Sequence, residues 1–175
     1  MPALVSPDVR YRSSFLAMMA EFADEGRTGD DSMIGHHLAR YGDTWAGEEG
    51  FAAYVAALHA EETRPSRPGF VCQTTLWWAE GEELIGRLSI RHRLTEELLH
   101  VGGHIGYDVR RSRRREGHAT AMLAAALPVA HALGIDPTLV TCDVDNVASR
   151  KVIEANGGRL EDQRHDKLRL WVPTS

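Results

Sequence analysis

The chain has 175 residues, of which 43% are hydrophobic and 26% charged. These values are typical of one folded domain with a single core, and they exclude a disordered or fibrous chain. The formal net charge is −5, but residues 1–62 hold eleven Asp and Glu against four Arg, whereas residues 63–175 net +2. An acidic N-terminal third favours a role in solubility, and attraction of a cationic amine stays open as the alternative.

Cysteine usage and hydropathy bear on the compartment. Cys72 and Cys142 are the only cysteines and have neither disulfide nor metal-type spacing, which suits a reducing cytoplasm. No apolar run approaches the roughly 20 residues that span a membrane, and residues 1–10 lack the pattern of an export signal. We therefore expect a cytoplasmic protein without a membrane partner, in which residues 1–175 form one domain.

The N-terminal half predicts helices followed by a hairpin. Apolar residues recur at helical spacing in three segments: residues 15–23, 33–38 and 51–58. Two prolines within residues 63–69 preclude a continuous helix there. Residues 70–79 and 84–93 are rich in β-branched and aromatic residues, which predicts a β-hairpin. Trp77 and Trp78 are adjacent on the first of these strands, so they should point to opposite faces and pack as core or edge residues.

The second half predicts alternating strands and helices after a polar break that contains Thr95, Glu96 and Glu97. The expected elements are strands at 104–110 and 139–143, helices at 117–133 and 146–156, and one or two strands within 159–172. Pro128 falls inside the first of these helices and removes one backbone hydrogen bond. We expect the helix to kink or to end early there.

The link between strand 104–110 and the helix after it suits a pyrophosphate. A helix start offers unpaired backbone N–H groups and the positive end of the helix dipole. Gly117 lets a phosphate approach the backbone and the small Ala119 keeps that approach open, while Thr120 adds a hydroxyl and nearby arginines add charge. The sequence has no Gly-Lys-Ser/Thr loop and no three-glycine dinucleotide fingerprint, which disfavours nucleoside triphosphates and NAD.

These residues resemble the GNAT superfamily of N-acetyltransferases. Its acetyl-CoA motif is Arg or Gln, two residues, Gly, one residue, then Gly or Ala, which Arg114, Gly117 and Ala119 match. The longer family pattern begins at Val109 and departs once, because Arg111 stands where proline is common. Downstream, residues 140–143 are similar to the family's splayed strand, and residues 145–149 to its Asn-led helix start.

The resemblance implies a mixed α/β, α+β-like fold in one domain: a twisted, mostly antiparallel sheet with helices on both faces, and a splayed parallel strand pair that binds acetyl-CoA within residues 103–158. It implies an N-acetyltransferase that uses acetyl-CoA and no metal, and whose acceptor is a primary amine of a small molecule or peptide. The cofactor-binding residues expected from it are Val109, Arg111, Arg114, Arg115, Glu116, Gly117, His118, Ala119, Thr120, Asn146 and Ser149. Backbone groups near Val109 would pair with pantetheine, and residues 114–120 would bind the pyrophosphate.

The catalytic groups do not follow the family pattern. Ile153 stands seven residues after Asn146, where many members have a Tyr that protonates the departing thiolate. Acetyl transfer also needs a base for the amine and a donor for the oxyanion, for which a backbone N–H near residues 107–109 is a candidate. The side-chain candidates for catalysis are His104, Tyr107, Cys142 and Asp143.

Several alternatives remain at this point. The departure at Ile153 keeps open a non-catalytic CoA-binding or regulatory module. Five arginines within residues 110–115 could be a nucleic-acid footprint, but the chain is acidic and has no second basic stripe. The histidines, for example His36 and His37 or the set at 92, 100 and 104, lack metal-ligand spacing. We expect neither nucleic acid nor metal, and the sequence leaves a monomer and a homodimer open.

Overall fold

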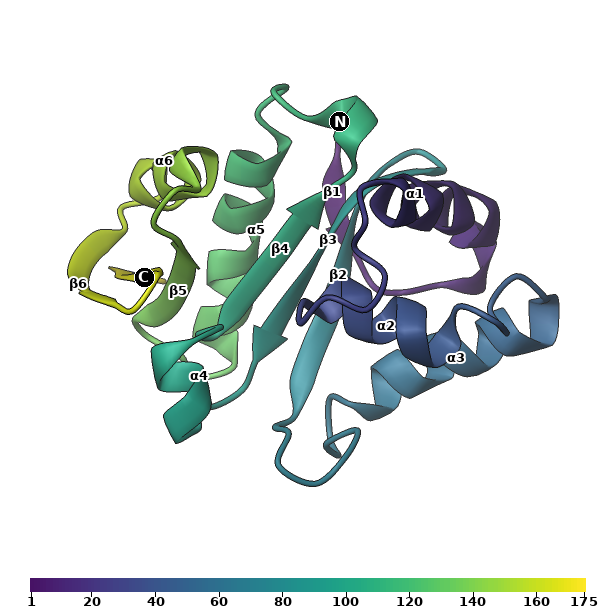
Figure 1. The fold of residues 1–175 in the computed structure, drawn as a ribbon, viewed down its shortest axis with the longest axis horizontal. Coiled ribbons are helices and arrows are strands. Elements are labelled where there is room, and N and C mark those ends of the chain that lie inside the picture. The colour runs from purple at the N-terminus through teal and green to yellow at the C-terminus, as the bar shows by residue number, and fades with distance from the viewer.

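Seven strands form two antiparallel sheets in the computed structural model, which describes residues 1–175 (Figure 1). The first sheet has the order β1-β2-β3-β4, with bounds Ala3–Val5, Gln73–Glu80, Glu83–Arg91 and Ile105–Val109. The second has the order β5-β7-β6, with bounds Thr138–Asp143, Lys167–Val172 and Arg159–Arg164. The expected hairpin is therefore β2 and β3, and the expected C-terminal strand region is a second hairpin.

The helices lie on both faces of the first sheet. Their bounds are Arg12–Asp24 (α1), Met33–Tyr41 (α2), Glu48–Ala60 (α3), Glu96–His100 (α4), His118–Ala132 (α5) and Val147–Ala155 (α6). Figure 1 shows α1, α2 and α3 together on one side of β2 and β3, away from α5 and α6. The mixed α/β fold with a mostly antiparallel sheet is therefore confirmed, as are the five helices that apolar periodicity predicts.

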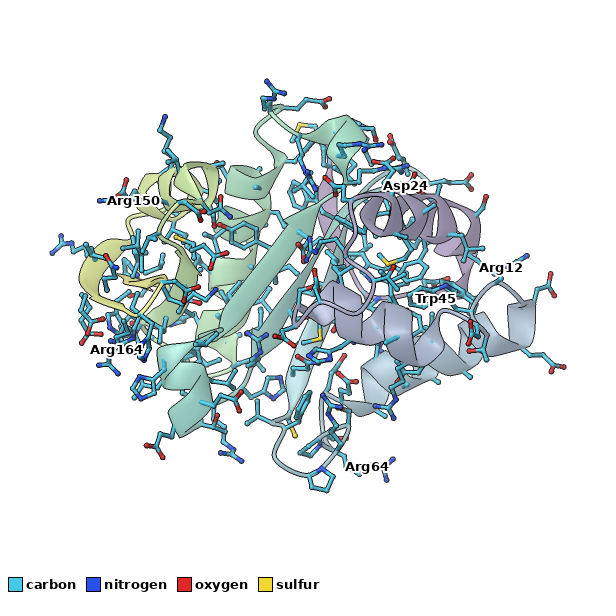
Figure 2. All side chains as sticks on the ribbon, viewed as in Figure 1. Arg12, Asp24, Trp45, Arg64, Arg150 and Arg164 are labelled. Carbon is cyan, nitrogen blue, oxygen red and sulfur yellow. The ribbon has the colours of Figure 1, made fainter.

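The two tryptophans of β2 divide the core as their alternation predicts. Trp77 packs among aromatic side chains of α1 and α3, including Phe15 and Phe51. Trp45, labelled in Figure 2, belongs to the same cluster and contacts Phe15 edge to face. Trp78 belongs to the opposite core, which α5 and α6 complete. The sheet is consequently anchored on both faces, and neither Trp77 nor Trp78 lines the cleft described below.

Two local expectations were wrong, and one strand was not predicted. The polar break is the short helix α4, because the Thr95 side chain caps it by accepting a hydrogen bond from the Leu98 N–H at 3.2 Å. Strand β1 is only three residues long and forms through pairing with β2, so no local pattern marks it. Helix α5 does not end early at Pro128 but continues to Ala132. Pro128 and Ala124 are both exposed, so the Ala124 carbonyl, which loses its donor, can face water.

The two sheets meet where β4 and β5 begin. The His104 N–H donates to the Leu139 carbonyl at 2.8 Å, and the Leu139 N–H donates to His104 Nδ1 at 2.9 Å. A Cβ on Gly103 would lie 2.4 Å from the same carbonyl, so only glycine permits this approach. β4 and β5 then share no ladder, and a cleft lined by the later residues of each opens between them. This is the splayed pair that the sequence predicts.

Candidate functional site

The start of α5 presents a run of free backbone donors. The N–H groups of residues 115–120 have no acceptor in the protein, and the first donor that is paired belongs to Ala121, which bonds the Gly117 carbonyl at 3.1 Å. An α-helix leaves its first N–H groups without partners, and its dipole places positive potential at the same end. Six consecutive free donors at an exposed helix start form a site that suits a phosphate or pyrophosphate.

Gly117 makes this geometry accessible. Its φ of +83° lies in the left-handed region, where a side chain is strained. A Cβ built at Gly117 meets no atom within 4 Å, so the backbone on this side is open rather than covered. Arg115 also has a positive φ, of 64°, and this turn helps to direct neighbouring N–H groups outward. The glycine of the motif is therefore needed for backbone conformation and for close approach.

The arginines of the loop divide into paired and unpaired residues. Arg110 donates to Glu21, Arg113 to Glu83 and Glu116, and Arg114 to Glu25. The remaining two, Arg111 and Arg115, are exposed and have no ion pair. Carboxylates at the C-terminal end of α1, at the start of β3 and in the loop itself therefore neutralise most of the cluster, which disfavours a nucleic-acid footprint. Arg111 and Arg115 are therefore the loop arginines that could bind a phosphate without breaking an ion pair.

The other motif side chains mainly contact the protein. His118 Nδ1 accepts a hydrogen bond from Trp78 Nε1 at 3.2 Å, and His118 Nε2 lies 3.1 Å from Glu116. Ala119 and Thr120 are half-buried in the first turn of the helix. Glu116, His118, Ala119 and Thr120 can therefore contribute to an anion site through their backbone N–H groups, which differs from a site built on side-chain charge.

The free edge of β4 offers backbone groups to a second part of a ligand. Partners alternate along an antiparallel ladder, and the Arg110 N–H bonds the Ile85 carbonyl of β3 at 2.9 Å. The same alternation directs the backbone groups of Tyr107 and Val109 away from β3, toward the splayed strand β5. Arg114 Nε occupies the Val109 carbonyl at 2.9 Å, so Val109 offers its N–H.

A cleft of about 280 Å³ lies between the splayed strands. Its walls come from β3, β4 and β5, the segment that leads into α2, and the start of α6. Asn146 caps α6 by accepting a hydrogen bond from the Ser149 N–H at 3.0 Å. The Ser149 hydroxyl lies 2.8 Å from the Tyr107 hydroxyl, which joins the two sides of the cleft. Asn146, Ser149 and Tyr107 all line it.

Three of the four catalytic candidates line the cleft. Burial raises the pKa of Tyr107 to about 12, so its hydroxyl stays protonated. Burial and the neighbouring Asp143 raise the pKa of the Cys142 thiol, which therefore stays neutral, and Asp143 is paired with Lys167. His104 does not line the cleft; its Nδ1 is occupied by the Leu139 N–H, and burial followed by the charge of Arg91 lowers its pKa to about 4.

Position 153, where many family members have a tyrosine, is occupied by an isoleucine that packs in the core. Its side chain is fully buried and belongs to the hydrophobic core that includes residues of α5. The position is consequently a packing position in this chain. The Tyr107 hydroxyl, contributed by β4, is the phenol that faces the cleft instead.

Sequence reasoning missed the polar wall of the cleft on β3. Arg87, Ser89 and Arg91 line it, whereas the alternate residues Leu88 and Ile90 face the core with α5. The alternation of polar and apolar residues along β3 was a usable signal, because it places arginines on a face of the sheet that other elements cover. Asp108 of β4 also lines the cleft, opposite Arg87 in the register, and accepts a hydrogen bond from Arg27 at 3.0 Å.

The structure also bears on membrane and metal binding. None of its helices has the length and apolar character required to cross a bilayer. His, Cys, Asp and Glu side chains do not gather in threes that could hold a metal ion, and this includes the histidines at positions 36, 37, 92, 100 and 104.

The sheet splits between β4 and β5, and an open helix start follows β4 directly. This arrangement is typical of transferases that use acyl-CoA. The family model for the acetyltransferase (GNAT) domain matches residues 29–159. The chain therefore belongs to the GNAT acetyltransferase family, and it is an N-acetyltransferase. A search of curated protein sequences finds no match.

Solved structures share the fold at low sequence identity. RimJ of Mycobacterium smegmatis, in complex with CoA-disulfide, has a TM-score of 0.68 and 21% identity, with 98% of this chain and 81% of RimJ covered. MccE, a microcin C7 self-immunity acetyltransferase in complex with acetyl-CoA and AMP, has a TM-score of 0.69 and 12% identity, covering 98% and 92%. RimL, a ribosomal L7/L12 α-N-protein acetyltransferase in complex with coenzyme A, has a TM-score of 0.65 and 17% identity, covering 96% and 90%.

Proposed function

We propose that this chain transfers the acetyl group of acetyl-CoA to a primary amine of a small molecule or peptide. The observation that carries the proposal is the run of six free N–H donors over residues 115–120, directly after a strand with an open edge. These donors suit a pyrophosphate, and the open edge of β4 suits the amide groups of pantetheine. The related structures that contain acetyl-CoA or coenzyme A support the same ligand.

The residues divide the work of binding. Backbone N–H groups of residues 115–120 would bind the pyrophosphate, with the free side chains of Arg111 and Arg115 adding charge at the rim. The N–H of Val109 would meet the pantetheine arm, which the splay between β4 and β5 admits. When bound, acetyl-CoA supplies an acyl thioester that is activated toward an amine. The strand N–H groups near Tyr107 would polarise the carbonyl of that thioester.

Tyr107 and Ser149 are the proposed acid pair. Their hydroxyls are 2.8 Å apart, and both residues line the cleft. The raised pKa of Tyr107, about 12, keeps a proton available at neutral pH. A phenol bonded to a serine can donate to a sulfur that develops negative charge and regain its proton from solvent through Ser149. This assigns to a residue of β4 the role that the family pattern would give to position 153.

Substitutions at two glycines, Gly117 and Gly134, test cofactor binding. Gly117→Trp should abolish the rise in melting temperature that acetyl-CoA gives the unmodified protein, because the indole covers the free donors. Gly134→Trp is the matched control, since Gly134 has a similar φ of +79° and equally open surroundings at the far end of α5. The control should lose stability through the same backbone strain but keep the acetyl-CoA shift. No shift for the unmodified protein at millimolar acetyl-CoA would refute the proposal.

A thiol-release assay tests the acceptor class. Over a panel of amines and peptide N-termini, the unmodified protein should release CoA thiol faster than the hydrolysis rate for at least one primary amine. Release that no member of the panel raises above the hydrolysis rate would refute a primary amine of a small molecule or peptide as the acceptor.

A further inference from the structure

Two arginines in the cleft lack a carboxylate partner. Arg87 is only 1% exposed. Arg91, which lies four residues further along the same face of β3, is half-buried. Neither forms an ion pair. Arg87 Nη1 contacts His37 Nδ1 at 3.1 Å, but the buried Nη2 has no hydrogen-bond partner. Arg91 Nη1 donates only to the carbonyls of Gly102 and Gly103, at 3.0 and 3.2 Å.

The other charges of the cleft are already neutralised. Arg27 pairs with Asp108 and also with Asp30, and Lys167 pairs with Asp143 and also with Asp166, so both of these cations have carboxylate partners. Glu61 is a buried carboxylate, but it accepts from Gln73 Nε2 at 2.5 Å and forms no ion pair with either arginine. Among the charged residues that line the cleft, Arg87 and Arg91 are therefore the two without an ion-pair partner.

Such an arrangement is costly without a ligand. A buried charge without a counter-ion loses its hydration without regaining it, and an unpaired donor adds to that loss. Burial, followed by the positive charge of Arg87, lowers the pKa of Arg91, as expected for a buried cation with a second cation nearby. A planar guanidinium group matches the two oxygens of a carboxylate or phosphate. An anion in the cleft would satisfy Arg87 Nη2 and relieve the repulsion.

We propose that the acceptor amine also carries an anionic group, a carboxylate or a phosphate, that binds Arg87 and Arg91. This rests on the proposed transferase function and narrows its substrate class. The anionic group would lie against the β3 face of the cleft beside the Ser89 hydroxyl, on the opposite sheet face from α5. The amine would then extend toward β4, where the thioester of acetyl-CoA is expected.

Anion binding can be measured without turnover. With coenzyme A saturating the start of α5, inorganic phosphate or acetate should raise the melting temperature of the unmodified protein above a chloride control of equal ionic strength. Arg87→Met and Arg91→Gln should each remove this rise, whereas Arg93→Gln, at an exposed arginine beyond β3, should keep it. If coenzyme A gives no shift, the proposed function fails. The anion titration is then made on Gly117→Trp, because its indole covers the free donors at the start of α5 and leaves the cleft arginines as the anion site under test. No anion-dependent rise, or a rise that both cleft variants keep, overturns the inference.

Acceptor pairs then identify the anionic group. Glycylglycine against its amide tests a carboxylate, and phosphoethanolamine against ethanolamine tests a phosphate. The anionic member of one pair should have a KM lower by about tenfold or more, because it alone forms charged hydrogen bonds with the two arginines. Arg91→Gln should remove that advantage and leave the KM of the neutral member unchanged. Equal KM values within both pairs, or an advantage that survives in Arg91→Gln and in Arg87→Met, would contradict the inference.

Discussion

Arg114 donates two hydrogen bonds to the carboxylate of Glu25, at 2.5 and 2.9 Å, and so ties the loop before α5 to the end of α1. We therefore predict that the arginine that marks the acetyl-CoA motif acts on the loop rather than on the ligand. Arg110 and Arg113 make equivalent contacts with Glu21 and Glu83. The free donors of residues 115–120 are presented by a loop that carboxylates from two other elements anchor.

Arg114→Ala and Arg115→Ala should therefore separate stability from affinity. Arg114→Ala removes a partly exposed ion pair and should cost about 0.5 to 1 kcal/mol of unfolding free energy. Arg115→Ala should leave stability unchanged but raise the Kd of coenzyme A about two- to fivefold, an effect that added salt removes. Urea unfolding and calorimetric titration at two ionic strengths measure both quantities. A larger loss of affinity in Arg114→Ala than in Arg115→Ala would show that Arg114 contacts the ligand directly.

Glu21 should make stability depend on pH in the acid range. Burial alone would raise its pKa, but hydrogen bonds from Arg110 and from the Ser112 backbone and hydroxyl lower it from 4.5 to about 2. Because the folded-state pKa is below the unfolded one, the stabilisation is complete above pH 4.5 and is lost as the pH falls toward 2. Glu21→Gln should lose roughly 2 to 3 kcal/mol at neutral pH. The exposed Glu48→Gln is the control, and equal melting temperatures for the two variants would refute the role of Glu21.

Local signals account for the part of the site that the sequence predicts. The glycine at 117, the cap at Asn146 and the apolar periods around them act within a few residues, so the strand, loop and helix could be placed from the sequence. Contacts between distant segments could not be placed in this way. Arg114 meets a carboxylate 89 residues earlier, and the buried Arg87 contacts His37 of α2, 50 residues earlier. The acceptor side of the cleft is built from such contacts.

Tyr107→Phe should lower kcat about 10- to 100-fold and leave the KM of acetyl-CoA unchanged, because it removes a proton donor but keeps the packing of the ring. Ser149→Ala should have a similar effect, and the double variant should lose little more, since the two hydroxyls act together. Tyr41→Phe, a half-buried tyrosine outside this cleft, is the control. With a pKa of about 12, Tyr107 should cause no loss of kcat up to pH 10. An unchanged kcat in Tyr107→Phe would exclude it as the acid.

His104, at the junction of the two sheets, should make the free energy of unfolding depend on pH. Its Nδ1 accepts from the Leu139 N–H, and its pKa of about 4 lies below the unfolded value of 6.5. The folded state therefore stays unprotonated while the unfolded chain gains a proton, so stability is lost as the pH falls from 6.5 to 4.

His104→Leu should remove this pH dependence, which amounts to roughly 2 to 3 kcal/mol of unfolding free energy. The variant also leaves the Leu139 N–H without an acceptor, which should cost about 1 to 3 kcal/mol at neutral pH. Urea unfolding from pH 4 to 7.5 measures both effects, and amide hydrogen exchange at Leu139 should become faster. His36→Leu, at an exposed histidine, should keep the pH dependence of the unmodified protein. If His104→Leu and the unmodified protein show the same slope of unfolding free energy against pH, His104 does not join β4 to β5 in the way that its hydrogen bond indicates.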